Sequence, residues 1–338
     1  MGMKSMKVWD LHCDTLYRLL GREDTAGEPA VEAFAKDGGM LDLAKMRAGD
    51  YLLQCFACFV GLEESPDPLV SALREADLFH RLLAAYPDDL VWVKSAADID
   101  KLGEDGRIGA MLTIEEGAVC RDDLAILRDF YRLGVRMMTL TWNHQNGLGS
   151  PNITPDYNED TWPVKDPGAP GLTGVGREFV AEMERLHMIV DVAHLSDAGI
   201  RDLLAIATRP FAASHSNARA CCPHLRNLPD ELLRAMGEKG CLIGLNYCPA
   251  FLDDTPDRKH CIGSVAQMAR HANYILNLAG EDALALGSDF DGIGGELEIT
   301  GAQDLPLLAE GLVNEGIPAR VVEKIFYKNA RRFFRENL

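Results

Sequence analysis

The chain alternates short apolar segments with longer segments of helical periodicity, and this alternation restricts its fold more than any other feature. Eight short segments are rich in β-branched residues and have the length of buried strands. They are residues 8–11, 52–60, 108–114, 135–141, 189–192, 211–213, 242–245 and 283–286. Because strands that alternate with helices pair in parallel, the pattern predicts a parallel sheet.

The segments between these strands carry apolar residues at the spacing of one helix face. The clearest are residues 68–85, 124–133, 176–187, 229–239 and 265–279. Eight βα units of this kind point to an α/β fold, a closed (β/α)8 barrel of the TIM type. No linker rich in Pro, Gly or Ser divides the sequence, and no internal repeat is found, so we expect one barrel domain over residues 1–338.

One connection, residues 142–171, is far longer than the usual loop of about two to six residues between a strand and a helix. It is rich in Asn, Pro, Asp and Gly, and two interpretations are open: a disordered insertion, or an ordered lid or wall beside a pocket. Four apolar residues that could anchor it favour the ordered wall. They are Trp142, Leu148, Tyr157 and Trp162.

The charge balance excludes several classes of partner. The formal net charge is −18 and the basic residues are scattered, which argues against nucleic acid and anionic membranes. No segment approaches the roughly 18 uninterrupted apolar residues of a membrane span, and the first residues lack the apolar centre of a secretion signal. The nine cysteines are spread along the chain, so a reducing cytoplasm is expected. The pair Cys55 and Cys58 has no second pair at zinc-finger spacing and is expected in the core.

Residues able to bind metals cluster where the predicted strands end, which is where barrel enzymes build their sites. His12 and Asp14 follow the first strand with a spacing that places their side chains on one face. Other strand ends contribute Glu115, His194, His215 and Asp289. A lone histidine after an apolar segment is more often a structural residue, but these strand ends must converge if the barrel closes.

This set of donors predicts metal-assisted hydrolysis. Imidazole nitrogens together with carboxylate oxygens suit zinc, and less specifically cobalt or manganese. A central carboxylate can bridge two ions about 3.5 to 4 Å apart, which would hold one hydroxide between them. One ion would also polarise the carbonyl that is attacked.

Seven segments spread over nearly the whole chain resemble, in order, those of the membrane (renal) dipeptidase family of zinc peptidases, within the amidohydrolase superfamily. They are DLHCDTL at 10–16, IEEG at 114–117, LT at 140–141, DVAHLS at 191–196, SHSNAR at 214–219, RNLPD at 226–230 and GSDFDGI at 287–293. The resemblance implies a peptidase with two Zn2+ ions per chain. His12 and Asp14 would hold one ion, and His194 and His215 the other.

The resemblance implies further roles. Glu115, rather than its neighbour Glu116, matches the bridging position. Asp289 is similar to the acidic residue that moves the proton between the attacking water and the leaving amine, although it could instead only orient a ligand. Arg226 would clamp the free carboxylate of a dipeptide, for which a planar guanidinium is suited; the alternative is a surface arginine.

The sequence departs from the family at one position. Members often carry a histidine directly after the LT segment, where this chain has Trp142, and His144 follows two residues later. Either His144 reaches the same space from the loop or Trp142 narrows the pocket, so both are candidates for substrate binding.

We therefore predict a cytoplasmic metal-dependent dipeptidase that hydrolyses L-Xaa-L-Xaa dipeptides and, as the resemblance implies, L-Xaa-D-Xaa dipeptides. Two alternatives stay open. One is another amidohydrolase, such as an N-acyl-amino-acid deacylase or a lactonase, and the other is a non-catalytic binding protein. A homodimer is implied by the resemblance alone.

Overall fold

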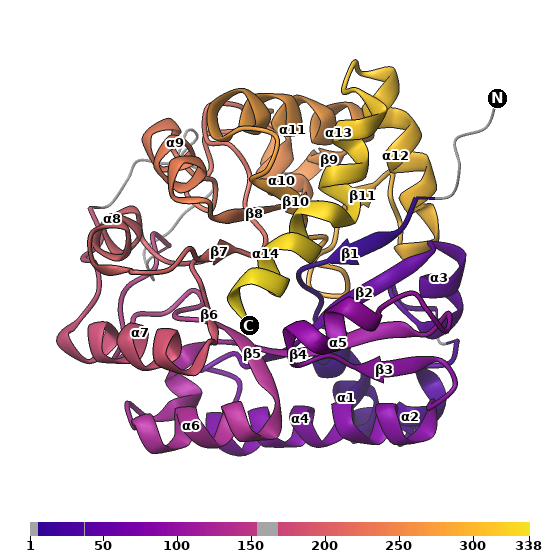
Figure 1. Ribbon diagram of the computed structural model, residues 1–338, viewed down its shortest axis with the longest axis vertical. Helices are drawn as coiled ribbons and strands as arrows, with labels where there is room; N and C mark the ends of the chain where they lie inside the picture. The colour runs from indigo at the N-terminus through magenta and orange to yellow at the C-terminus, as the bar shows by residue number, and fades with distance from the viewer. Residues whose placement is uncertain (1–5, 37, 154–167) are drawn as a thin grey trace.

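The computed structural model describes residues 6–36, 38–153 and 168–338, and its centre is a closed barrel of parallel strands (Figure 1). In the order of the ring, the strands are β1 Val8–Asp10, β2 Tyr51–Phe59, β4 Ile108–Glu115, β5 Val135–Thr139, β6 Ile189–Asp191, β7 Ala212–Ala213, β8 Leu242–Leu245 and β10 Leu284–Leu286. β1 pairs with both β2 and β10, which closes the ring. The predicted (β/α)8 barrel and its eight strands are confirmed.

Helices surround the barrel, and the five predicted helical segments are all helical. The described helices are α1 Thr15–Ala26, α2 Ala30–Ala33, α3 Leu43–Ala48, α4 Pro68–Ala85, α5 Ala96–Lys101, α6 Leu124–Leu133, α7 Gly174–Leu186, α8 Asp197–Ile206, α9 Asp230–Lys239, α10 Pro249–Leu252, α11 Val265–Ala279, α12 Leu305–Asn314, α13 Ala319–Glu323 and α14 Asn329–Asn337. Several begin at a side chain that accepts a hydrogen bond from the first turn, as Asp123 does for α6, Thr173 for α7 and Ser196 for α8.

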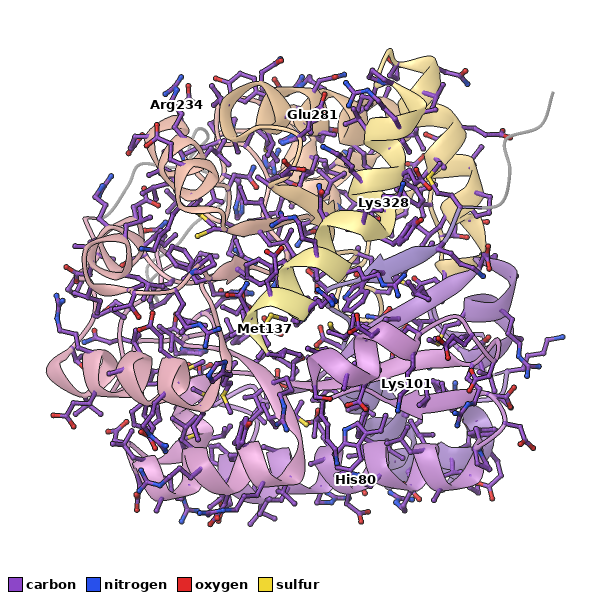
Figure 2. All side chains as sticks on the ribbon, in the orientation of Figure 1. His80, Lys101, Met137, Arg234, Glu281 and Lys328 are labelled. Carbon is purple, nitrogen blue, oxygen red and sulfur yellow. The ribbon has the colours of Figure 1, made fainter. Side chains whose placement is uncertain are left out.

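The last helix covers the end of the barrel at which the strands begin. α14 crosses the middle of the ring in Figure 1, and its Phe334 stacks on Trp9 of β1 with ring centroids 5.5 Å apart. Met137 of β5 belongs to the same buried apolar cluster and lies near the centre of Figure 2, whereas Arg234 and Glu281 lie at the periphery. Because this end is filled with apolar side chains, a polar site has room only at the other end, where the strands terminate.

Three strands approach one another closely near that open end. A Cβ atom on Gly244 or on Gly287 would lie 1.9 Å from the carbonyl oxygen of Ser214. Only glycine therefore fits after β10 and within β8, and the close approach brings the residues that follow β7 and β10 together.

Some elements differ from the prediction. β3 Leu90–Trp92 pairs with the first residues of β4, and β9 Ile262–Gly263 pairs with β11 Glu296–Leu297 in a separate small sheet; none of these three was predicted.

The connection over 142–171 is described to residue 153 and from residue 168, so Tyr157 and Trp162 lie outside the described residues. Of the other two predicted anchors, Leu148 is fully buried and Trp142 is half-buried.

The structure also bears on the cysteines and on possible membrane segments. Cys55 and Cys58 are buried in β2, as expected, and none of the nine cysteines forms a disulfide. Among the described residues, no helix combines the length and the apolar character that crossing a membrane requires.

Candidate metal centre and active site

The predicted metal donors converge at the open end of the barrel. His12 and Asp14 follow β1, Glu115 ends β4, His194 follows β6, His215 follows β7 and Asp289 follows β10. Their donor atoms form three groups, and the atoms within each group lie within 4.8 Å of one another. These groups are His12, Asp14 and Glu115; Glu115, His194 and His215; and His12, His215 and Asp289.

Glu115 lies between two sets of donors. Its Oε2 is 3.1 Å from His12 Nε2, while its Oε1 is 2.9 Å from His194 Nε2 and 3.4 Å from His215 Nε2. The two oxygens of one carboxylate therefore face different sets of ligands. This is the geometry that a carboxylate shared between two cations needs.

Several buried polar atoms at this centre are compatible with bound cations. Within the described residues, His12 Nε2 and Asp14 Oδ1 are buried and make no hydrogen bond. The Nε2 atoms of His194 and His215 lie 3.0 Å apart. Two imidazole lone pairs at this distance repel each other unless a cation lies beside them. Nitrogen and carboxylate donors in this arrangement fit divalent metal ions.

Two neutral side chains orient the histidines. Nδ1 of His194 lies 2.8 Å from the side-chain oxygen of Asn143, so Nδ1 carries the proton and Nε2 keeps its lone pair. Nδ1 of His215 lies 2.8 Å from the hydroxyl of Ser214, which donates to Asp191 at 2.6 Å. Such partners fix the tautomer and the direction of a metal-binding imidazole.

The three histidines differ in charge. Burial lowers the pKa of His194 to about 4 and holds the pKa of His215 well below its usual value, so both are neutral near pH 7. Burial acts in the same direction on His12, but the carboxylates of Glu115 and Asp14 outweigh it and raise the pKa of His12 well above its usual value. Neutral imidazole is the form that binds a metal, so His194 and His215 are already in that form, whereas His12 would release its proton when an ion binds beside these carboxylates.

Asp289 lies at the edge of the centre and faces the cavity. Its Oδ1 is 3.8 Å from His12 Nε2, and its Oδ2 accepts a hydrogen bond of 3.0 Å from the side-chain amide of Asn246. Its backbone φ is 63°, a conformation that is uncommon outside glycine and that concentrates at functional sites. Burial raises the pKa of Asp289 to about 7, so this carboxyl group can gain or lose a proton near neutral pH.

Glu116 has a different role from its neighbour. Its carboxylate accepts hydrogen bonds from the backbone N–H groups of Ala118 at 2.8 Å and Trp142 at 3.0 Å, and from the side chain of Asn146. It therefore holds the beginning of the long loop after β5. Of the two adjacent glutamates, Glu115 alone belongs to the groups of metal donors.

Arg226 is buried beside the centre, with 4% of its surface exposed. Its two terminal nitrogens donate to the backbone carbonyls of Ala193 and His215, the second at 3.2 Å. Its Nε is buried and makes no hydrogen bond to any described residue. The guanidinium is thus fixed in place at a residue that lines the cavity, and its Nε–H is left without a hydrogen-bond partner.

A cavity of about 410 Å³ opens above the donors, which is within the range of small-molecule sites. Six of the predicted site residues line it: Asp14, Glu115, Trp142, His194, Arg226 and Asp289. The other lining residues are Tyr17, Phe59, Glu64, Asn143, Cys248, Phe251, Asp291, Gly292, Ile293 and Gly294. Trp142 therefore reaches the cavity, and its ring centroid lies 6.2 Å from that of His194. His144 does not line the cavity: it packs behind Trp142 at 5.6 Å, with Nδ1 3.8 Å from Glu63.

Four polar residues at the site were not found from the sequence: Asn143, Ser214, Asp191 and Asn246. Ser214 directly precedes a predicted ligand, and Asp191 lies in the last part of a predicted strand, so their positions carried some signal. Asn143 and Asn246 follow predicted strands, but an asparagine in a loop does not by itself indicate a functional residue.

Comparison with known proteins gives a family match over nearly the full length. A family model described as membrane dipeptidase (peptidase family M19) matches residues 2–337. A curated protein of Klebsiella pneumoniae, described only by its position 5′ of pqqA, is 34% identical over 78% of this chain and 94% of its own. The dipeptidase aclJ of Aspergillus oryzae is 32% identical over 82% of this chain and 65% of its own length.

Solved structures agree with this match. A metallopeptidase described as dipeptidase AC has a TM-score of 0.87 with 27% identity and covers 99% of both chains. A metallopeptidase from Rhodobacter sphaeroides, solved with a phosphinate mimic of the dipeptide L-Ala-D-Ala, also has a TM-score of 0.87 with 25% identity, over 99% of this chain and 100% of its own.

Proposed function

Since the chain belongs to the membrane dipeptidase family, we propose that it is a metal-dependent dipeptidase that hydrolyses L-Xaa-L-Xaa and L-Xaa-D-Xaa dipeptides. The observation that carries the proposal is the position of Glu115 between two sets of donors at the floor of a cavity whose wall holds the buried Arg226. Acceptance of a D-residue at the second position is supported by the similarity to the peptidase that was solved with a mimic of L-Ala-D-Ala.

Two zinc ions are the proposed cofactors. His12 and Asp14 would hold one, His194 and His215 the other, and Glu115 would contact both. When bound, the ions would activate a water molecule for attack and polarise the carbonyl of the scissile amide. Cobalt or manganese would suit the same donors less specifically.

Asp289 is proposed to move the proton that hydrolysis requires. It accepts the proton of the attacking water on one carboxylate oxygen and delivers it to the nitrogen of the leaving amine. Asn246 donates to Oδ2, which leaves Oδ1 facing the donors. The hydrogen bond thus selects the oxygen that takes part.

Arg226 is proposed to bind the terminal carboxylate of the substrate. Its free Nε–H can donate to one carboxylate oxygen, and its positive charge has no carboxylate partner within hydrogen-bond distance among the described residues. A fixed cation at a fixed distance from the metals selects dipeptides over longer chains, because only a dipeptide places its terminal carboxylate there. Trp142 narrows the same cavity, and His144 is proposed to support Trp142 rather than to touch the substrate.

The test combines metal content with substrate class. The purified protein is loaded with zinc, analysed for metal, and assayed on L,L and L,D dipeptides, on tripeptides, on N-acetyl amino acids and on simple lactones. We expect about two zinc ions per chain and hydrolysis confined to dipeptides. Hydrolysis of N-acetyl amino acids or lactones alone would favour the other amidohydrolase, and a metal-loaded protein inert to every substrate would favour a binding protein.

Two further expectations stay predictions. Cysteines that form no disulfide agree with a reducing compartment such as the cytoplasm. A homodimer is expected from the resemblance, and sedimentation would test it.

A further inference from the structure

A second cavity lies beside the active-site cavity and has a volume of about 290 Å³. The two cavities share Tyr17, Phe59 and Glu64, so these three residues form a common wall. The mechanism proposed above uses none of them. A wall that borders the metal centre on one side and a further space on the other is suited to receive part of a substrate.

This wall is on the side of the barrel mouth opposite Arg226. Phe59 ends β2, and Glu64 lies in the loop that follows it, whereas Arg226 lies in the loop after β7. In the closed ring β2 and β7 are separated by three strands on either side. A dipeptide held at its carboxylate by Arg226, with its amide at the metals, therefore directs its N-terminal residue toward the Tyr17, Phe59 and Glu64 wall.

The apolar part of the wall is aromatic. Tyr17 packs edge-on against Phe59, with ring centroids 5.2 Å apart and an interplanar angle of 84°. Phe59 packs in the same manner against Trp142, at 5.0 Å and 71°. The rings thus form a continuous surface. Aromatic faces bind aliphatic stems, and they also attract cations through the ring quadrupole.

The polar part of the wall is anionic. The Tyr17 hydroxyl donates to Glu64 at 2.9 Å, which uses one carboxylate oxygen. The second cavity also contains Asp24, Arg74 and the buried Glu75. Arg74 is paired with Asp24 at 2.6 Å, so the one basic side chain among the lining residues is already neutralised. Burial raises the pKa of Glu75 well above its usual value, so the negative charge that remains on this side is the carboxylate of Glu64.

Glu64 is held in a defined place. The backbone N–H groups of Glu64 and Ser65 donate to the carbonyl of Gly61 at 3.2 and 3.1 Å, which closes a turn. The hydroxyl of Ser65 lies 2.7 Å from that of Ser71 in the first turns of α4. The loop is thus attached to a long helix. Because the backbone of Glu64 is already fixed, little conformational entropy is lost when its carboxylate binds a substrate group.

We propose that Tyr17, Phe59 and Glu64 form a recognition site for a cationic side chain on the N-terminal residue of the substrate, so that dipeptides beginning with arginine or lysine are preferred. This inference rests on the proposed function and on the substrate orientation that it gives. The aliphatic stem of the side chain lies along the aromatic rings, and its charged head pairs with Glu64. An acidic N-terminal side chain is rejected by the same charge.

The experiment compares two dipeptides that differ in charge and little in shape. The zinc-loaded enzyme is assayed with L-Arg-L-Ala and with L-citrulline-L-Ala, and L-Ala-L-Ala serves as a test of dipeptidase activity itself. We expect kcat/KM for the arginine dipeptide to exceed that for the citrulline dipeptide by about tenfold, the contribution of one charge-assisted hydrogen bond at a partly exposed site. The Glu64→Gln variant keeps the size and the acceptor for Tyr17, and its ratio should fall to about two.

Glu63→Gln is the matched control. Glu63 precedes Glu64 directly and lines neither cavity, and its side chain is 81% exposed, so this variant loses the same charge at nearly the same place. It should keep the wild-type ratio of arginine to citrulline substrates. If both variants lowered the ratio equally, the general negative potential and not Glu64 would be responsible, and the inference would be wrong.

The remaining outcomes separate this inference from the proposed function. Hydrolysis of L-Ala-L-Ala together with a wild-type ratio near one would overturn the cationic preference and leave the dipeptidase proposal intact. A high ratio that survives in Glu64→Gln would overturn the role of Glu64. A zinc-loaded protein that cleaves none of the three dipeptides would overturn the proposed function itself.

Discussion

The hydroxyl of Ser214 lies 2.8 Å from Nδ1 of His215. The hydroxyl has a single proton, which it donates to Asp191 at 2.6 Å, so toward the imidazole it can act only as an acceptor. Nδ1 must therefore carry the proton, and the lone pair of His215 is left on Nε2, the atom that faces Glu115 at 3.4 Å. One hydrogen bond thus decides which nitrogen can bind a metal.

The first prediction follows from this relationship. Ser214→Ala removes the acceptor, frees the tautomer and the ring of His215, and should lower zinc affinity about 10- to 100-fold. The measurement is a zinc titration in a metal buffer that follows the recovery of dipeptidase activity.

Ser216→Ala is the control for Ser214→Ala. Ser216 is equally buried, but its hydroxyl makes only a long contact of 3.5 Å with the carbonyl of Ala193. The Ser216→Ala variant should bind zinc with the affinity of the wild type. Equal affinities in all three proteins would contradict the orienting role of Ser214.

The second prediction separates two adjacent glutamates. Glu115→Gln removes the charge shared between two groups of donors and should reduce bound zinc to at most about one ion per chain, with loss of activity. Glu116→Gln places an amide N–H against N–H donors of the loop and should leave zinc content unchanged while destabilising the protein by roughly 1 to 3 kcal/mol. Elemental analysis and thermal unfolding measure the two effects, and loss of zinc from Glu116→Gln would reverse the assignment.

The barrel was predictable because its strands are short, apolar and β-branched, and because helices of clear periodicity separate them. The convergence of His12, Glu115, His194 and His215 followed from one rule, that parallel strands present their carboxyl ends at one face. The covering of the opposite end by α14 was not predicted. The stacking of Phe334 on Trp9 joins the two ends of the chain, and nothing local in either segment signals it.

The prediction was least informative for the partners of the ligands. Trp142 and His144 were the predicted candidates for substrate binding. Asn143 lies between them in the chain, and it is Asn143 that contacts His194. Which of the three successive loop residues can form a hydrogen bond with His194 depends on the path of the backbone, and Glu116 fixes that path by accepting a hydrogen bond from the N–H of Trp142. Side-chain direction in a loop has no periodicity, so sequence alone could not select among them.

The third prediction concerns the carboxylate of the substrate. If Arg226 binds it, the wild-type enzyme should hydrolyse a dipeptide about 100-fold better, in kcat/KM, than the same dipeptide with an amidated C-terminus. In Arg226→Lys this ratio should fall by at least about tenfold, because an ammonium group on a flexible stem cannot replace the fixed Nε–H. The ratio is informative even if the variant is less stable, since both substrates meet the same protein. An unchanged ratio would argue that the carboxylate binds elsewhere.

The fourth prediction concerns stability against pH and a buried histidine far from the metals in sequence. His271 is fully buried; its Nδ1 accepts from the N–H of Ala218 at 3.1 Å, and its Nε2–H faces the carbonyl of Leu252 at 3.2 Å. Burial lowers the pKa of His271 to about 4. The unfolded chain, with a histidine pKa of about 6.5, therefore takes up a proton before the folded protein does.

The contribution of His271 to stability should consequently be constant above about pH 7 and fall, by up to about 3 kcal/mol, as the pH decreases from about 6.5 toward 4. His271→Asn keeps an acceptor for Ala218 without a titrating ring, so it should lower stability at pH 7.5 and make the remaining stability less dependent on pH. Urea unfolding of both proteins at pH 7.5, 6 and 5 tests this. The metal ligands are common to both proteins, and their titration cancels in the difference. Parallel curves for the two proteins would show that His271 is not the group that titrates.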